Sequence, residues 1–133
     1  MKNLFLSLFV FISIGLKAQV HSFTVHFEQG SHVCDCKNDV WPVLTMVKNQ
    51  VPTQDIFVLE LRAYSWETTG QGTNFLFLAP LRAQNVADCV EKWRANQTPI
   101  LPPQGFFQMS YFYSTRGTDP EFQKVEIDLD RIL

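Results

Sequence analysis

The sequence has no hydrophobic run long enough to cross a bilayer. Its longest apolar stretch, Leu4–Leu16, holds thirteen residues, whereas a membrane-spanning helix needs about 20. Lys2 precedes this stretch and Ala18 follows it, an arrangement typical of a secretory signal peptide. The sequence therefore predicts a signal peptide over 1–19 and a single domain over 20–133 without a transmembrane segment. Such a protein is exported to the periplasm or the outer membrane, or is secreted.

Basic residues are few and scattered. Once Lys2 and Lys17 leave with the signal peptide, nine basic residues remain against thirteen acidic ones, a net charge near −4. An acidic chain without a cluster of lysine and arginine lacks the electrostatic footprint of a nucleic-acid-binding protein, so no nucleic acid is expected as a partner. The remaining length, about 115 residues, is enough for one domain with one core.

The sequence also lacks a recognisable catalytic arrangement. All three histidines lie within residues 21–32, and no serine or cysteine stands with them at a spacing that nucleophilic catalysis uses. A C-x-x-C pair is absent too, which argues against a thiol oxidoreductase. We therefore expect a protein that is not an enzyme and has no cofactor.

Cysteine is scarce, with only Cys34, Cys36 and Cys89. In an oxidising compartment an odd number permits one disulfide and one free thiol. A bond between Cys34 and Cys36 would close a very small and strained ring, so Cys89 is the expected partner of one of them. His32 and the two neighbouring cysteines suggest a metal clip, but no second Cys/His pair completes four ligands, and no metal is predicted.

Hydrophobic periodicity predicts four strands and two helices. The strands are expected over 22–28, 55–65, 106–114 and 122–129, and the helices over 40–51 and 80–96. Asp39 is the expected N-cap of the first helix. Pro42 and Pro80 fit the first turns of the two helices, where a missing N–H costs little.

The same periodicity assigns faces to these elements. Alternation places Phe57, Leu59, Leu61 and Ala63 on one face of the second strand, and it buries Val125, Ile127 and Leu129 of the fourth. The second helix buries a stripe of Val86, Cys89, Val90 and Trp93. Residues Arg116–Pro120 predict a hairpin-like turn between the last two strands. The order is β-α-β-α-β-β, which predicts an α+β fold with two helices on one face of a mixed four-stranded sheet.

One stretch, Glu67–Val86, fixes a carboxylate and an arginine fifteen positions apart, in E-T-T-G-Q-G-T-N-F-L-F-L-A-P-L-R-A-Q-N-V. It resembles the signature of the OmpA-like C-terminal domain family, G-H-T-D-x-x-G…L-S-x-x-R-A-x-x-V. Glu67 falls on the Asp of that signature, Gly70 on its Gly, and Arg82 on its Arg. Family members share the predicted order of elements and bind bacterial peptidoglycan, so the resemblance, which covers 23–129, implies that fold and that partner.

In this family the acidic residue pairs with the ammonium group of diaminopimelate, and the arginine holds its carboxylate. A zwitterionic ligand needs one group of each sign, and arginine supplies a two-pronged clamp that lysine cannot reproduce. The ligand site that the resemblance implies consists of Glu67, Arg82, Gly70, Tyr64, Ser65 and Lys124. A second register, which aligns Ala63-Tyr64-Ser65 with G-H-T, would instead put Trp66 in the acidic position.

An alternative function remains open beside peptidoglycan binding. The same scaffold, without a working peptidoglycan site, would serve as a protein-interaction module with an envelope protein as its partner. Three aromatic residues, Tyr64, Trp66 and Phe75, belong to the segment of the implied ligand loop, and aromatic side chains often anchor protein interfaces.

Overall fold

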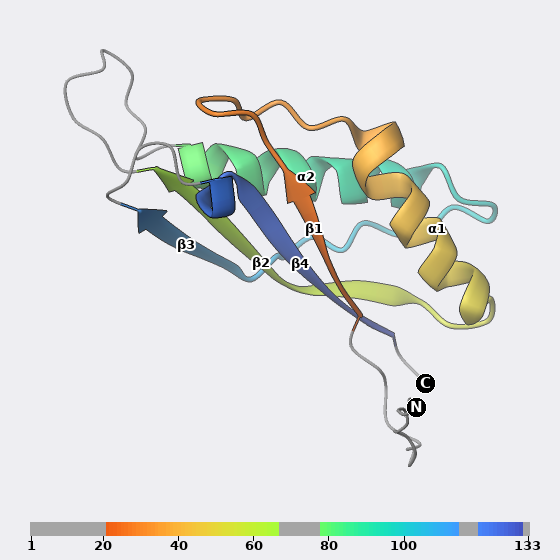
Figure 1. Cartoon of the computed structure of the whole chain (residues 1–133). Coiled ribbons are helices and arrows are strands. Elements are labelled where there is room, and N and C mark those ends of the chain that lie inside the picture. The colour runs from red at the N-terminus through yellow and green to blue at the C-terminus, as the bar shows by residue number, and fades with distance from the viewer. Residues whose placement is uncertain (1–20, 67–77, 115–119, 132–133) are drawn as a thin grey trace, which may run out of the picture.

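The computed structural model describes residues 21–66, 78–114 and 120–131. Strands β1 (His21–His26), β2 (Ile56–Trp66), β3 (Met109–Ser114) and β4 (Lys124–Arg131) form one sheet in the order β1-β4-β2-β3 (Figure 1). Strands β2 and β3 run parallel, whereas β4 runs antiparallel to both β1 and β2. The sheet is therefore mixed, as the sequence predicts.

Two helices pack on one face of this sheet (Figure 1). A short π-helix, η1 (Cys36–Val40), leads directly into α1 (Trp41–Gln50), while α2 (Leu78–Ala95) connects the parallel strands β2 and β3. A 3₁₀ turn, η3 (Pro120–Phe122), precedes β4. This arrangement confirms the predicted α+β architecture. None of the described helices is long and apolar enough to cross a membrane.

The cap predicted for the first helix is wrong. Asp39 lies inside η1, and Asp35 caps this element instead, because its side chain accepts a hydrogen bond from the main-chain N–H of Asn38 at 3.3 Å. The N-cap of α1 is Val40, which makes no side-chain cap. Pro42 does lie in the first turn of α1, where the sequence places it.

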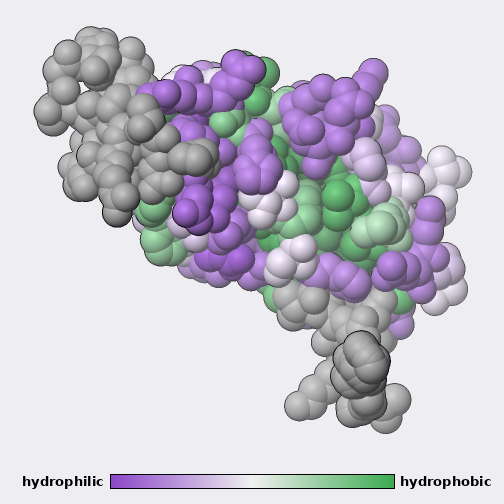
Figure 2. All heavy atoms as spheres, viewed as in Figure 1, coloured by the Kyte–Doolittle hydropathy of each residue, from purple (hydrophilic) through white to green (hydrophobic). Residues whose placement is uncertain are grey.

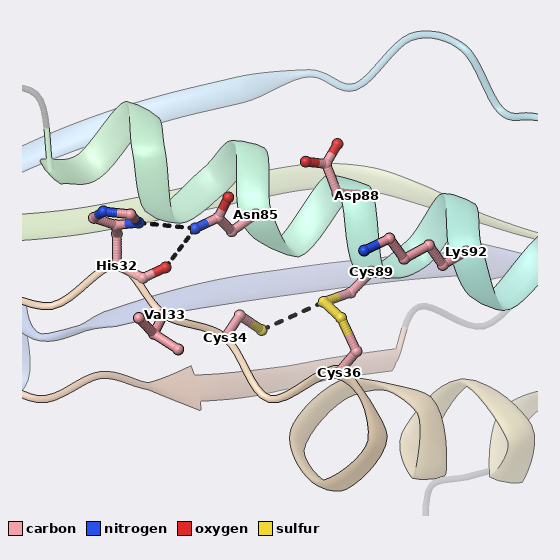
Figure 3. Close-up of a pocket in the computed structure, with 8 residues that line it drawn as sticks. All are labelled: His32, Val33, Cys34, Cys36, Asn85, Asp88, Cys89 and Lys92. Carbon is pink, nitrogen blue, oxygen red and sulfur yellow. Dashed lines mark hydrogen bonds between the residues drawn. A yellow bond between two sulfur atoms is a disulfide. The ribbon is translucent and has the colours of Figure 1, made fainter.

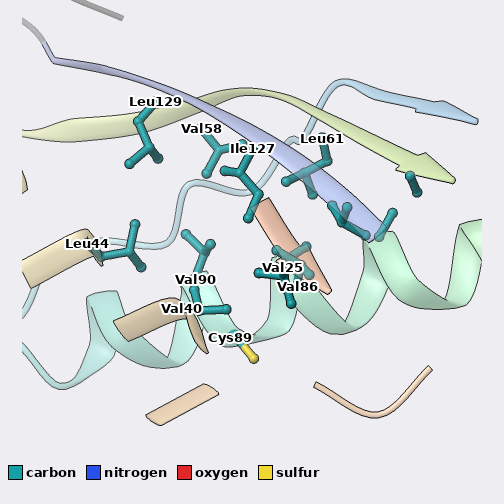
Figure 4. Packing of buried hydrophobic residues seen from close by; sticks show 14 of the residues in the cluster. Val25, Val40, Leu44, Val58, Leu61, Val86, Cys89, Val90, Ile127 and Leu129 are labelled. Atoms are coloured by element: carbon teal, nitrogen blue, oxygen red, sulfur yellow. The ribbon is translucent and has the colours of Figure 1, made fainter. Parts of the chain in front are cut away.

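The core lies between the helices and the sheet (Figure 4). The predicted stripe of α2 is confirmed, since Val86, Cys89, Val90 and Trp93 are at most 3% exposed. The alternation of β4 is confirmed as well, because Val125, Ile127 and Leu129 are buried. Hydrophilic residues cover most of the surface seen in Figure 2, which leaves a smaller hydrophobic area near its middle.

A β-bulge corrects the faces predicted for β2. The pairing with β4 shifts register between Val58 and Glu60, so Leu59 is an extra residue on this strand. Leu61 and Ala63 face the core as predicted, but Val58 joins them there and Leu59 is 44% exposed. One inserted residue therefore reverses the faces of the first half of the strand.

The hairpin predicted between the last two strands is also wrong. Strand β2 lies between β3 and β4 in the sheet, so the two strands that flank the predicted turn do not pair. Of the predicted turn Arg116–Pro120, residues 116–119 lie outside the described residues, and Pro120 begins η3.

A disulfide joins Cys36 to Cys89, with 5.3 Å between their Cα atoms. This confirms that Cys89 pairs with one of the two neighbouring cysteines, and it ties the start of η1 to α2. The indole N–H of Trp41 donates to the carbonyl oxygen of Cys89 at 2.9 Å, which adds a second link at the same place.

Candidate functional site

The most unusual side chain in the described structure is Arg82, in the first turns of α2. It has no exposed surface, and its five N–H groups all point to oxygen atoms of this chain. Four of the acceptors are main-chain carbonyls: Ser31 at 2.7 Å from Nε, Tyr64 and Phe122 at 2.9 and 3.3 Å from Nη1, and Glu28 at 3.1 Å from Nη2. The fifth is Oε1 of Gln123, at 2.8 Å from Nη2. We call this group of residues the guanidinium site.

The positive charge of Arg82 has no counter-charge among the described residues. Burial lowers the pKa of Arg82 to about 10, so the group still carries its proton at neutral pH. All five acceptors are neutral, and none of the ion pairs in the described part of the chain involves this residue. A buried cation is normally paired with an anion, which makes the guanidinium site a place where a negative charge would be stabilised.

Gln123 is a member of this site that the sequence does not reveal as functional. Its side chain is 7% exposed, and its Nε2 group has no hydrogen-bond partner among the described atoms. A buried donor without a partner costs free energy. The site therefore combines an uncompensated cation with a free donor, and a carboxylate would satisfy both.

The other residues of the implied ligand site fall in different places. Glu67 and Gly70 lie outside the described residues. Ser65 is fully buried on the helix side of β2. The carbonyl oxygen of Tyr64 accepts from Arg82, so the structure brings the arginine to the end of β2, one residue before Glu67.

The side chains of Tyr64 and Lys124 lie on the open face of the sheet, away from the helices. The hydroxyl group of Tyr64 donates to Oε1 of Glu126 at 2.8 Å, and Nζ of Lys124 lies 3.2 Å from Oε2 of the same carboxylate. Nζ of Lys124 also lies 4.8 Å from the centre of the Tyr64 ring. These two side chains thus contact each other and Glu126, on the opposite side of β2 from the guanidinium group.

They belong to a network on this open face, which we call the charge ladder: Glu60, Arg62, Lys124, Glu126 and Asp128. Arg62 bonds to Asp128 through both terminal nitrogens and to Glu126 at 3.1 Å. The hydrogen bond from Arg62 lowers the pKa of Asp128. The pKa of Glu126 is raised by burial, but hydrogen bonds from Tyr64, Arg62 and Lys124 outweigh this and lower it overall.

A cavity of about 390 Å³ lies beside the guanidinium site, and its lining includes three carboxylate residues, Glu28, Asp35 and Asp39. Phe27 also lines it, and the guanidinium carbon of Arg82 lies 5.1 Å from the centre of the Phe27 ring. Within the described ranges, no three His, Cys, Asp or Glu side chains converge in the way that metal ligands do.

Exposed aromatic residues mark the edge of the sheet at β3. Tyr111, Phe112 and Tyr113 are 37–41% exposed. The ring of Phe112 stacks on that of Tyr64, with 4.9 Å between the ring centres. In the described part of the sheet β3 pairs only with β2, so its other edge carries no strand.

The chain is thus an α+β domain with a buried cationic site at the end of its second strand. No protein-family model matches the sequence, and no curated protein does. Among solved structures, the chain is similar to the OmpA-like domain of FopA1 from Francisella tularensis subsp. tularensis SCHU S4. The identity is 16% and the TM-score 0.49, over 91% of this chain and 81% of that one.

Proposed function

We propose that this chain is an exported, non-catalytic binding domain of the cell envelope, and that the guanidinium site receives a carboxylate of a peptidoglycan peptide. The observation that carries this proposal is a fully buried Arg82 beside a Gln123 amide, where the residues that the structure describes supply neither a counter-charge for the first nor an acceptor for the second. Export is supported by the signal-like start of the sequence and by the disulfide between Cys36 and Cys89.

The charge argument favours a carboxylate over a neutral ligand. A neutral acceptor would only replace one of the five neutral acceptors that Arg82 already has. A carboxylate would instead exchange a neutral acceptor for a charged one, and the resulting charge-assisted hydrogen bond is strongest in such a water-poor environment.

The acidic half of the ligand site is Glu67 in this proposal. Strand β2 ends at Trp66, so Glu67 follows directly from the strand whose Tyr64 carbonyl binds Arg82. An acid and an arginine at this point would hold the ammonium and carboxylate groups of one zwitterion, the chemistry of a diaminopimelate side chain.

A ligand carboxylate has to compete with the existing bonds of Arg82. The longest of them runs from Nη1 to the carbonyl oxygen of Phe122, at 3.3 Å, and it is the first that we expect to exchange. The amide of Gln123 offers a new bond without the loss of an old one. This competition predicts a moderate affinity, with specificity for the charged ligand.

The test is co-sedimentation of the purified mature chain with peptidoglycan sacculi. We expect the parent to pellet, and we expect Gln123→Glu to bind at least about tenfold more weakly, because the new carboxylate occupies Arg82 from within the protein. This variant keeps the guanidinium group and does not leave it unpaired, so its loss of binding cannot be assigned to unfolding if its melting temperature is at or above that of the parent.

Gln84→Glu is the matched control, since it makes the same change at an exposed position of α2. It should pellet like the parent. If the parent itself stays in the supernatant, peptidoglycan binding is wrong. If parent and Gln123→Glu pellet equally, Arg82 does not hold the ligand.

A second function is favoured by the exposed aromatic residues of β3. An extended segment of a partner protein could add as a strand to the open edge, with Tyr111 and Phe112 as side-chain anchors. The experiment is photo-crosslinking in intact cells from a photoreactive analogue at position 112. A single crosslinked protein, lost in Tyr111→Ser, together with a parent that does not pellet with sacculi, would favour this function over the first.

A further inference from the structure

Cys34 is a free cysteine that lies against the disulfide of the other two. Its Sγ atom is 3.6 Å from Sγ of Cys89, and Figure 3 shows the side chain pointing at the bond between Cys89 and Cys36. Any direct attack of a thiolate on a disulfide requires such an approach of the attacking sulfur to one of the bonded sulfurs. Neither the scaffold nor the guanidinium site requires a third cysteine here.

The segment that carries Cys34 is fixed in this position. Nδ2 of Asn85 on α2 lies 3.0 Å from Nδ1 of His32 and donates to the His32 carbonyl oxygen at 2.5 Å (Figure 3). This contact holds the loop before η1 against the same helix that bears Cys89. Cys34 is therefore held on one flank by the His32–Asn85 contact and on the other by the Cys36–Cys89 disulfide, and these two contacts maintain the 3.6 Å distance between the sulfurs of Cys34 and Cys89.

We infer that Cys34, Cys36 and Cys89 form a thiol–disulfide exchange site, in which Cys34 replaces Cys36 as the partner of Cys89. Cys34 gives its thiol proton to solvent, and the thiolate attacks Sγ of Cys89. The bond between Cys34 and Cys89 forms while the bond between Cys36 and Cys89 breaks. The bonding electron pair leaves with the Cys36 sulfur, which then takes up a proton, so the exchange consumes no oxidant or reductant.

Both disulfides close rings of nearly the same size. The sequence separation is 53 for Cys36 and Cys89, and 55 for Cys34 and Cys89. The chain entropy that a disulfide removes from the unfolded state depends only weakly on ring size, so it does not favour either isomer. The preference is left to local packing, and in this proposal both isomers are populated at equilibrium.

A cavity of about 250 Å³ opens beside the sulfurs, so that solvent can carry the proton from one cysteine to the other (Figure 3). Besides the cysteines, its lining consists of His32, Val33, Asn85, Asp88 and Lys92. The exchange frees the thiol of Cys36, which is the first residue of η1. The protein thereby carries a different free cysteine in each isomer.

The burial of Cys34 and the charges near it set the rate of this exchange, because they determine how much of the thiol is ionised. Burial first of all, and then the charges of Asp39 and Asp35 on its own segment, together raise the pKa of the Cys34 thiol to about 11. His32, Asp88 and Lys92 are the other ionisable groups around the cavity. Only the thiolate attacks, so the rate should rise about tenfold per pH unit from neutrality up to pH 11.

The experiment follows the free thiol in the purified, fully oxidised chain. The protein is kept at pH 7 to 10 without added thiol, quenched in acid and alkylated, and then cleaved before aspartate, since Asp35 separates the two cysteines. We expect the alkyl label to start on Cys34 and to reach a constant share on Cys36, at a rate that does not depend on protein concentration. Label that stays on Cys34 at every pH would overturn the inference.

Variants give a second and independent readout. Cys36→Ser should still contain a disulfide, now between Cys34 and Cys89, and should show no free thiol. Cys34→Ser should keep the original disulfide with no exchange. Asp39→Asn should speed up the exchange at pH 8, because it removes a negative charge beside the thiol. Two free thiols in folded Cys36→Ser would contradict the proposal, and if this variant does not fold, the label on the parent still decides.

Discussion

Arg94 donates from both of its terminal nitrogens to the carboxylate of Asp55, over 3.2 and 2.9 Å. Among the residues whose burial the structure describes, the two fully buried arginines are Arg82 and Arg94, and both lie on α2. Of these two, only Arg94 has an anionic partner in the described contacts. The rest of the Arg94 environment resembles that of Arg82, because its other acceptors are the carbonyl oxygens of Pro102 and Ile56. Comparison of Arg94 with Arg82 therefore shows what a carboxylate contributes to stability at a buried arginine.

Asp55→Asn should destabilise the domain by about 2 to 3 kcal/mol, since it leaves the buried Arg94 without its counter-charge. Chemical unfolding at pH 7 measures this difference. Asp88→Asn serves as the control, because Asp88 is exposed and bonds only to its neighbour Gln84 in the described contacts. The control should stay within about 0.5 kcal/mol of the parent. If Asp55→Asn loses no more stability than the control Asp88→Asn, the main-chain carbonyl oxygens alone satisfy Arg94.

The architecture could be predicted from the sequence where periodicity is unbroken. The alternation of β4 and the stripe of α2 identify their buried residues correctly, because each pattern follows from the geometry of one element. Leu59 shows the limit of this reasoning. The bulge at this position depends on the pairing of β2 with β4, and no glycine or proline in the strand marks it.

The candidate site also contains one residue that the sequence could identify and one that it could not. Arg82 could be singled out because it stands in a motif with Glu67. The importance of Gln123 could not be predicted, since its role rests on a contact with Arg82 across 41 positions of the sequence. Its only sequence signal is its place beside Lys124, one of the residues of the implied ligand site. A contact between distant elements is a property of the fold, and local patterns do not encode it.

The charge ladder should make the domain sensitive to acid. The folded-state pKa values of Asp128 and Glu126 are lowered, so the stability that these groups contribute is present above their ordinary pKa values of about 4 and is lost as the pH falls below them. Arg62→Gln removes the main hydrogen-bond donor to Asp128. We expect this variant to be about 1 kcal/mol less stable at pH 7 and to lose less stability than the parent between pH 5 and pH 2.

Urea unfolding at several pH values checks this prediction. Lys92→Gln is a suitable control, because it removes a basic side chain of α2, which packs on the opposite face of the sheet from the charge ladder. The control should follow the acid dependence of the parent. Parallel curves for the parent and Arg62→Gln would show that the ladder does not contribute to acid stability.

The signal peptide is a prediction that intact-mass analysis of exported protein can check. The mature chain should begin at Gln19 or Val20, just before β1 begins at His21. Cleavage at this point leaves every described strand and helix intact. Export with Met1 retained would show that the apolar run Leu4–Leu16 is not removed.

Gln123→Glu should make the domain more stable, although it changes a buried residue. The new carboxylate stands 2.8 Å from Nη2 of Arg82, in the place of the amide oxygen, and it also removes the unpaired donor Nε2. A charge-assisted bond to a guanidinium group that is already buried should raise the free energy of unfolding by about 1 to 2 kcal/mol at pH 7.

The gain should disappear when the carboxyl group is protonated, so melting curves at pH 7 and pH 3 separate the effect of charge from that of packing. Gln123→Met is the matched variant, since it keeps the size of the side chain and removes both polar atoms. It should be less stable than the parent at both pH values, because one N–H of Arg82 then lacks its acceptor. If Gln123→Glu is destabilised at pH 7 as much as Gln123→Met, an anion is not stabilised beside Arg82. The guanidinium site would then serve only to join the end of β2 to the start of α2.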